Sequence, residues 1–364
     1  MKILYITPKI NNEGGVARVL SVKTNYLVEK LGYDVSIITQ NSANLPLFFK
    51  FNDKVNLFDI KLRKNRVLFL LDYKKQVSRI IKEVNPNAIV ISDNGLKGFL
   101  FPFIIATKIP IIFEVHGSRY NEEFNFNKNI VSNFFHNLKY KIRNYGASKF
   151  DYFIALSKQS AAEWSIKNTT IIPNPIEKFS NSVATLDSST VLFVGRHSYE
   201  KGLDRVLKIW KIIVEKHPNW RLEIYGKGDD EKKYFNLCKE LKLENNTFFY
   251  EPTTTIYEKY LAASICIMTS RHEGFPMVLL EAMNYGLPIV AFDCPIGPRS
   301  IITNNQEGFL IEDNDLDAFA VKLQLLIEDS SLRKKMGKNA KESVLKYNLD
   351  SVMSQWKLFF EELE

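Results

Sequence analysis

Short apolar runs recur along the chain, and each is followed by a polar loop and a longer segment with helical periodicity. Near-continuous apolar runs are typical of strands that are buried on both faces, as in a parallel sheet covered by helices. Residues 16–31 have the pattern of an amphipathic helix that ends at Gly32. In the first half of the chain, the apolar runs occupy residues 3–6, 35–39, 88–91, 111–115 and 152–156.

The same alternation restarts in the second half of the chain. Residues 171–175 and the polar residues 180–190 lie between the two series, and prolines followed by Ser, Asn and Thr are typical of a linker. The second series predicts a helix over residues 203–216 and a last helix over residues 349–360. Its predicted strands are residues 191–194, 221–225, 247–250, 265–268 and 288–292.

Two consecutive series of this kind predict an α/β fold with two Rossmann-like, doubly wound domains that face a central cleft. We expect an N-terminal domain over residues 1–175 and a C-terminal domain over residues 176–345. A ligand is expected in the cleft, where the carboxyl ends of the strands converge. The last helix, within residues 346–364, is expected to pack back on the first domain through Val352, Met353, Trp356, Phe359 and Phe360.

Composition narrows the class of protein. The 364 residues are 45% hydrophobic and 25% charged, which excludes a disordered or fibrous chain. The three cysteines are widely spaced and form no CxxC pair, so we expect a reducing, cytoplasmic compartment and no disulfide framework. The most apolar stretch, residues 99–113, contains Pro102, Lys108 and Pro110 and is shorter than the roughly 20 residues of a membrane span.

The net charge of +8 is carried unevenly. Residues 1–180 contain 26 Lys and Arg against 14 Asp and Glu, whereas residues 181–364 contain 23 against 27. Such a surface suits a polyanion, which can be anionic lipid headgroups, a pyrophosphate-bearing substrate or nucleic acid. A solvated basic face is the alternative. The excess lies in two clusters, Lys61, Arg63, Lys64, Arg66, Lys74, Lys75 and Arg79, and Lys128, Lys139, Lys141, Arg143 and Lys149.

The strongest local motif is SRHEGFPMVLLEAMNYG over residues 270–286, directly after a predicted strand. Pro276 fits the first position of a helix and Gly286 fits the residue just past its end. The N-terminus of a helix can hold phosphate or sugar oxygens. Glu273 precedes this helix and Glu281 lies inside it, so both carboxylates can project into one cleft and accept hydroxyl hydrogens of a sugar or ribose. A solvated helix glutamate is the alternative for each.

Further candidate residues follow other predicted strands. Arg196 and Lys201, in VGRHSYEKG, can both grip a diphosphate. Gly14 and Gly15 allow a ligand close to the backbone, but the spacing is not that of a dinucleotide-binding loop. His116 lies at a strand end, where contact with a ligand competes with a buried structural role. Asp313 and Asp315 have metal-site spacing, but helix capping explains them better.

Together, these motifs resemble the retaining GT-B glycosyltransferases of family 4 (glycosyltransferase group 1), along nearly the whole chain. The segment from Glu273 to Glu281, within the strongest motif, is similar to the E-x7-E motif of that family. The other matching segments are Gly14-Gly15, Glu114-Val115-His116-Gly117, Ile172-Pro173-Asn174 and Gly195-Arg196 with Lys201-Gly202.

The resemblance implies a role for each matching residue. Arg196 and Lys201 are expected to bind the donor diphosphate, Glu273 to contact the donor sugar near the reacting centre, and Glu281 to bind the ribose. Gly15 is expected to let the first loop close over the substrates. His116 is expected near the donor sugar, as a catalytic residue with Glu273. The backbone that holds sugar hydroxyls and phosphate is expected to be Gly274, Phe275, Pro276, Met277 and Val278. Because the family is generally metal-independent, no metal or other cofactor is expected.

The segment AFDCPIGPRSII over residues 291–302 is similar to bacterial enzymes that add galactose or N-acetylgalactosamine, although those enzymes usually carry glutamate at the position of Ser300. The expected reaction moves a hexose or N-acetylhexosamine from a UDP-sugar to a polysaccharide or a lipid-pyrophosphate-linked glycan. Binding to an anionic membrane, at the cytosolic face of the inner membrane, is expected, and nucleic acid is not. A GT-B-fold sugar-nucleotide epimerase and a non-enzymatic polyanion-binding protein are the alternatives.

Overall fold

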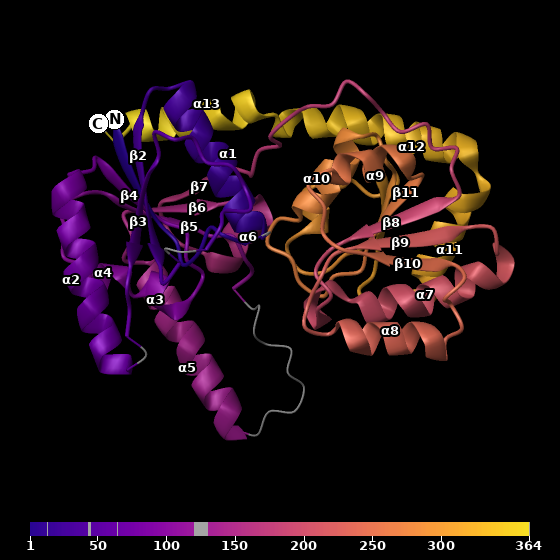
Figure 1. Ribbon diagram of the computed structural model, residues 1–364, viewed down its shortest axis with the longest axis horizontal. Helices are drawn as coiled ribbons and strands as arrows, with labels where there is room; N and C mark the ends of the chain where they lie inside the picture. Colours follow the sequence, from indigo (N-terminus) through magenta and orange to yellow (C-terminus); the bar gives the residue numbers. More distant parts are fainter. Residues whose placement is uncertain (13, 43–44, 64, 120–129, 364) are drawn as a thin grey trace. The chain divides into compact units, whose positions relative to one another are not determined.

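The computed structural model describes residues 1–12, 14–42, 45–63, 65–119 and 130–363. The chain divides into two compact units, one formed by Met1–Pro175 with Leu349–Glu364 and the other by Ile176–Asn348 (Figure 1). Each unit is an α/β domain with its own sheet and its own hydrophobic core.

The sheet of the first unit is entirely parallel, with the strand order β3-β2-β1-β4-β5-β6-β7. Strand order runs outward from β1 in both directions, which is the doubly wound arrangement that the sequence predicts. The edge strands β3 and β7 are not among the predicted runs, because β3 is half exposed and β7 is short. The strands are β1 (Lys2–Ile6), β2 (Asp34–Gln40), β3 (Asn56–Ile60), β4 (Ala88–Ile91), β5 (Ile111–Glu114), β6 (Tyr152–Ala155) and β7 (Thr169–Ile171).

Helices cover both faces of this sheet. One face packs against α1 (Gly15–Glu29) and α13 (Leu349–Glu361). The buried side of α13 consists of the five apolar residues that the sequence assigns to it, so the end of the chain completes the core of the first unit. The other face carries α2 (Arg66–Val84), α3 (Leu96–Phe99), α4 (Phe101–Ile104), α5 (Ile130–Ala147) and α6 (Lys158–Trp164).

The second unit repeats this topology with six parallel strands in the order β10-β9-β8-β11-β12-β13. Its strands are β8 (Thr190–Val194), β9 (Arg221–Tyr225), β10 (Thr247–Tyr250), β11 (Ile265–Met268), β12 (Ile289–Phe292) and β13 (Gly308–Ile311). Its helices are η1 (Tyr199–Lys201), α7 (Leu203–Lys216), α8 (Glu231–Glu240), α9 (Ile256–Ala262), α10 (Met277–Asn284), η2 (Pro298–Ser300), α11 (Leu316–Glu328), α12 (Ser330–Ser343) and η3 (Val344–Tyr347).

The two aspartates with metal-site spacing serve the fold. The Asp315 side chain accepts a hydrogen bond of 2.9 Å from the backbone N–H of Ala318, so Asp315 caps α11 as predicted. Asp313 forms an ion pair of 2.7 Å with Arg205. Both side chains therefore have structural partners.

The contribution of α13 can be tested with two residues of that helix. Phe360→Ala should lower the free energy of unfolding of the first unit by about 3–5 kcal/mol, because a fully buried ring leaves a cavity; the Phe360 side chain is 0% exposed. Leu358→Ala is the control, because Leu358 is 61% exposed. Urea unfolding of the full-length protein measures both, and equal losses would contradict the packing of α13.

Candidate active site

Two loops at the carboxyl edge of the second sheet are fastened together by Arg271. The guanidinium of Arg271 donates to both carboxylate oxygens of Asp204, at 2.9 and 2.7 Å, and to the carbonyl oxygen of Tyr199 at 2.6 Å. It also lies 3.9 Å from the centre of the Tyr199 ring. Burial tends to raise the pKa of Asp204, but the hydrogen bonds and charge of Arg271 outweigh burial and hold this pKa below its ordinary value. The loop after β11 therefore holds η1 in place.

Gly202 brings the same two loops close together. Its φ of +67° is in the left-handed region, and a Cβ atom there would lie 2.2 Å from the carbonyl oxygen of Thr269. The Thr269 hydroxyl donates to the carbonyl oxygens of Lys201 and Gly202 at 3.2 and 2.9 Å. Only glycine permits this approach, so Gly202 is needed to place Lys201.

Lys201 and Glu273 meet at this point. The Lys201 Nζ lies 2.7 Å from the Glu273 Oε1, and the two side chains are 24% and 8% exposed. A Cβ atom on Gly297 would lie 2.5 Å from the Cβ of Glu273, so the chain after β12 packs against this carboxylate. Burying an ion is costly unless it is paired, and Lys201 supplies the countercharge. The residue expected at the diphosphate is thus paired with the residue expected at the sugar.

Arg196 precedes Lys201 in the loop after β8, and the loop after β9 packs beside it. The Arg196 side chain is exposed, whereas the following residue, His197, is 2% exposed. A Cβ atom on Gly228 would lie 2.3 Å from the carbonyl oxygen of His197, so the Gly226-Lys227-Gly228 loop packs against the backbone beside Arg196. Burial lowers the pKa of His197, and Glu231 only partly opposes this effect.

Helix α10 begins one residue later than predicted. Pro276 is the N-cap, with an extended backbone (ψ 93°), and Met277 is the first helical residue. The prediction of Pro276 at the first helical position is therefore wrong by one residue, whereas Gly286 does follow the helix, with φ +73°. Gly274, Met277 and Val278 are partly buried, and Phe275 is buried with its ring 5.8 Å from that of Tyr347.

Glu281 has different surroundings from Glu273. It lies inside α10, is partly buried, and accepts a hydrogen bond of 2.9 Å from the Tyr260 hydroxyl. The Tyr260 ring stacks on that of Tyr285, with 5.7 Å between ring centres. Tyr260, like Arg271 and Asp204, is a residue that the sequence does not single out, because only the folded chain brings it to its partner.

The two remaining candidates lie in the first unit. Gly15 is the first residue of α1, and a Cβ atom on it would meet no atom within 4 Å, so packing does not require glycine there. His116 follows β5; its backbone N–H donates to the Asn94 side chain at 3.3 Å, and its Nε2 lies 3.6 Å from the Glu114 Oε1. The His116 side chain is 5% exposed.

In the ranges that the structure describes, no three His, Cys, Asp or Glu side chains come together as metal ligands would. All three cysteines are reduced and buried. Burial raises the pKa of the Cys294 thiol, and the charge of nearby Glu273 raises it further, so this thiol remains protonated at neutral pH.

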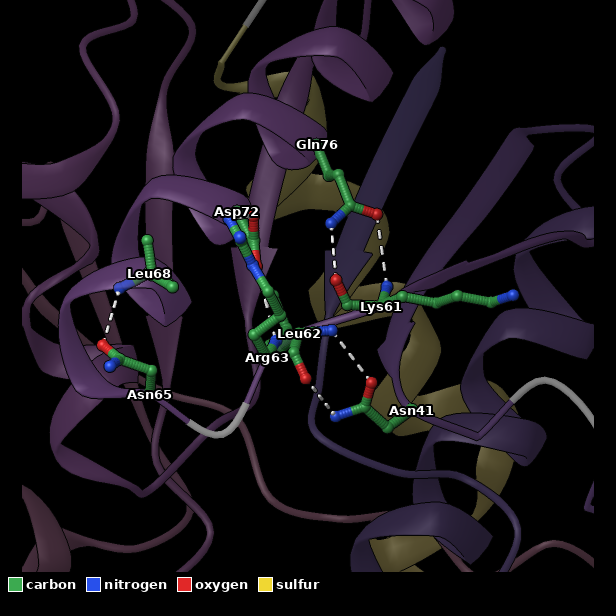
Figure 2. Close-up of polar contacts among 8 residues, drawn as sticks. All are labelled: Asn41, Lys61, Leu62, Arg63, Asn65, Leu68, Asp72 and Gln76. Carbon is green, nitrogen blue, oxygen red and sulfur yellow. Dashed lines mark hydrogen bonds and ion pairs between the residues drawn. The ribbon is translucent and has the colours of Figure 1, made fainter.

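Within the basic clusters, Arg143 is buried and Arg63 is paired with a carboxylate. Arg63 forms a bidentate pair with Asp72, at 2.7 Å for each bond, and fastens the loop between β3 and α2 (Figure 2). In the same loop, the Lys61 backbone exchanges hydrogen bonds with the Gln76 side chain (Figure 2). Arg143 is 4% exposed and lies 4.8 Å from the centre of the Phe99 ring. Arg143 therefore does not contribute to a basic surface, because its side chain is buried, whereas Arg63 is 58% exposed while it pairs with Asp72.

Other members of the clusters are exposed, notably Lys61, Lys74, Lys75, Arg79, Lys141 and Lys149. Lys64 and Lys128 lie outside the described residues, as does the side chain of Arg66. No helix within the described ranges combines the length and the apolarity that crossing a bilayer requires.

Comparison with known proteins identifies the class. Residues 13–178 match the family described as "Glycosyltransferase Family 4", and residues 176–343 match "Glycosyl transferases group 1". A glycosyltransferase of Haemophilus influenzae without assigned substrates is 30% identical over 98% of this chain and 99% of its own length. The chain therefore belongs to this family of glycosyltransferases, and the protein is an enzyme. The two parallel α/β domains are those of the GT-B fold.

Two further relatives act in the assembly of bacterial glycans. The amylovoran biosynthesis glycosyltransferase AmsD of Erwinia amylovora is 29% identical, over 98% of both chains. The lipopolysaccharide 1,6-galactosyltransferase of Escherichia coli is 30% identical over 49% of this chain and 52% of its own. Among solved structures, HepE of Anabaena in complex with UDP-glucose superposes with a TM-score of 0.79, at 17% identity and over 100% of both chains.

The role of Arg271 can be tested by a substitution that keeps its charge. Arg271→Lys should lower the free energy of unfolding by about 1–3 kcal/mol and also reduce turnover, because lysine cannot make the bidentate, ring-stacked contact. Lys227→Ala is the control, because its partner Glu251 lies 3.3 Å away and both side chains are exposed. Chemical unfolding and sugar-transfer assays measure the effects. An Arg271→Lys enzyme with wild-type stability and turnover would contradict the role of Arg271 in joining the two loops.

Proposed function

We propose that this glycosyltransferase moves a hexose or N-acetylhexosamine, of the galactose type, from a UDP-sugar to a polysaccharide or lipid-linked oligosaccharide precursor, with retention of the anomeric configuration. The observation that carries the proposal is the Lys201–Glu273 pair, at 2.7 Å, on the carboxyl edge of the second sheet. Such an edge is where doubly wound domains bind their ligands.

The chemistry follows from the charges of this site. The bond between the anomeric carbon and the donor phosphate breaks, and its electron pair leaves with UDP. An acceptor hydroxyl forms the new bond on the face from which UDP departs, and its proton passes to a phosphate oxygen. Lys201 and Arg196 stabilise the departing diphosphate, and Glu273 contacts the sugar that develops oxocarbenium character. We assign no protein nucleophile and no metal ion.

The remaining donor contacts come from the motif around α10. The backbone from Gly274 to Val278 binds sugar hydroxyls and phosphate near the N-terminus of the helix. Glu281, which already accepts a hydrogen bond from Tyr260, binds the ribose with its remaining acceptor capacity. By the family resemblance, Gly15 and His116 are also assigned to the donor sugar.

Two observations support UDP and a galactose-type sugar. HepE, which shares the fold, binds UDP-glucose, and a relative with 30% identity over half of the chain is a 1,6-galactosyltransferase. The segment over residues 291–302, which resembles galactose-adding enzymes, packs against Glu273 through Gly297. In this segment Arg299 donates to Asp293 at 2.8 Å, and the Ser300 hydroxyl donates to the carbonyl oxygen of Gly297 at 2.5 Å.

The proposal is tested with a panel of nucleotide sugars. Wild-type protein should release UDP slowly from UDP-galactose or UDP-N-acetylgalactosamine and little from GDP-sugars. Glu273→Gln should reduce this turnover at least about a hundredfold while UDP affinity changes much less, because its contact is to the sugar. Equal losses of turnover and UDP affinity would place Glu273 at the nucleotide, and an epimerised sugar would identify an epimerase instead.

Lys201→Ala provides the complementary measurement. This variant should weaken binding of UDP more than binding of uridine, because only UDP carries the diphosphate that Lys201 contacts. Lys208→Ala on α7 is the matched control, because Lys208 is an exposed lysine of the same unit. Unchanged UDP affinity in Lys201→Ala, measured by calorimetry, would remove Lys201 from the donor site.

We also propose that the first unit binds an anionic membrane, at the cytosolic face of the inner membrane, where a lipid-linked acceptor resides. The outer face of α2 supports this proposal. Leu70 and Leu71 on this helix are 45% and 58% exposed, and Lys74 and Lys75 follow them on the exposed side. Exposed leucines beside lysines suit the boundary between headgroups and acyl chains.

Membrane binding is measured by sedimentation with phospholipid vesicles. Lys74→Gln/Lys75→Gln should weaken binding to anionic vesicles by roughly tenfold or more, at about 1 kcal/mol for each lysine, and added salt should weaken wild-type binding. Lys208→Gln/Lys216→Gln on α7 removes the same charge from the second unit and should change binding little. Equal binding of the wild type to neutral and anionic vesicles would contradict the proposal.

A further inference from the structure

A buried ion pair lies in the first unit, beside the candidate residue His116. The Lys23 Nζ, from α1, lies 2.5 Å from the Glu114 Oε1 at the end of β5, and each side chain is 1% exposed. The other carboxylate oxygen of Glu114 accepts a hydrogen bond of 3.2 Å from the Ser92 hydroxyl. Both oxygens of Glu114 thus have partners within the core.

The C-terminal helix closes over this pair. The Lys23 Nζ lies 3.7 Å from the centre of the Trp356 ring on α13 and 5.6 Å from that of Tyr5 on β1. A buried cation is stabilised by aromatic faces as well as by its carboxylate. Burial lowers the pKa of Lys23, and Glu114 opposes this effect. Burial tends to raise the pKa of Glu114, but the charge of Lys23, with a smaller effect of His116, outweighs burial and lowers it.

Stability alone does not explain this arrangement. A buried ion pair often contributes no more than two packed apolar side chains of the same volume, because desolvation offsets the attraction. What the pair adds is a carboxylate oxygen fixed beside His116, whose Nε2 lies 3.6 Å from the same Oε1 that meets Lys23. A carboxylate next to one imidazole nitrogen favours the tautomer with its proton on that nitrogen.

We propose that Glu114 is a positioning residue for His116, kept in place by Lys23 under the Trp356 ring. Glu114 holds the imidazole with its proton on Nε2, which leaves Nδ1 with a lone pair to accept a hydrogen bond from a donor-sugar hydroxyl. This inference rests on the proposed function, in which His116 contacts the donor sugar. It gives Lys23, Glu114 and Trp356 one task, the orientation of a single imidazole.

The test removes both charges together. Lys23→Met/Glu114→Leu replaces the pair by apolar side chains, so the protein is expected to stay folded with a melting temperature near that of the wild type. The turnover number should fall about tenfold to a hundredfold, with a smaller change in KM for the UDP-sugar, because the imidazole loses its orientation. Lys357→Met/Glu361→Gln, an exposed pair of α13 with 3.6 Å between the charged atoms, is the control.

Nitrogen NMR of the His116 ring gives a readout that a merely structural role would not change. Wild-type protein should show a protonated Nε2 and an unprotonated Nδ1, and the double variant should show a mixture of tautomers. A wild-type ring protonated on Nδ1, or a folded double variant with unchanged turnover, would overturn the proposal. If His116→Ala keeps full turnover while the tautomer still depends on Glu114, the positioning stands and the proposed role of His116 at the sugar falls.

Discussion

The candidate site of the second unit is built around the contact between Arg271 and Asp204. The Arg271 guanidinium donates two hydrogen bonds to the Asp204 carboxylate and one to the carbonyl oxygen of Tyr199, and it lies against the Tyr199 ring. It therefore joins the loop after β8 to the loop after β11. The Thr269 hydroxyl, which donates to the carbonyl oxygens of Lys201 and Gly202, joins the same two loops. Between these loops, the Lys201 Nζ lies 2.7 Å from the nearly buried carboxylate of Glu273. The expected chemistry needs this preorganised positive charge, because a diphosphate must leave.

Each unit contains a carboxylate that a lysine neutralises at the carboxyl edge of its sheet, but the two pairs differ in exposure. Lys201 is 24% exposed and remains within reach of a ligand, whereas Lys23 is 1% exposed and is covered by Trp356. The first pair suits direct contact with a substrate that carries charge. The second suits a role inside the protein, because moving Lys23 away would leave the buried Glu114 carboxylate unpaired. In our proposals, the same pair of side chains serves binding in one unit and positioning in the other.

The positive charge of the first unit is distributed differently from what a residue count suggests. Both Arg63 and Arg143 stand within runs of basic residues. Arg63 is 58% exposed but paired with Asp72, and Arg143 is buried against aromatic rings. Lys74 and Lys75 on α2 do remain exposed, next to two exposed leucines. The sequence therefore shows which region is basic, and the folded structure determines which of its Lys and Arg side chains are exposed to a partner.

Apolar runs and helix signals in the sequence predict the central strands, the helices α7 and α13 and the capping role of Asp315, because burial on both faces and cap chemistry are local properties. They also locate Glu273, Lys201 and His116 at strand ends. Three edge strands are not among the predicted runs: β3, which is half exposed, β7, which has three residues, and β13, which has four and is mostly buried. Pairings such as Arg271 with Asp204, Tyr260 with Glu281, and Lys23 with Glu114 under Trp356 join residues far apart in the chain. No local pattern encodes them, because each partner's environment is created only when sheet, loops and returning helix pack together.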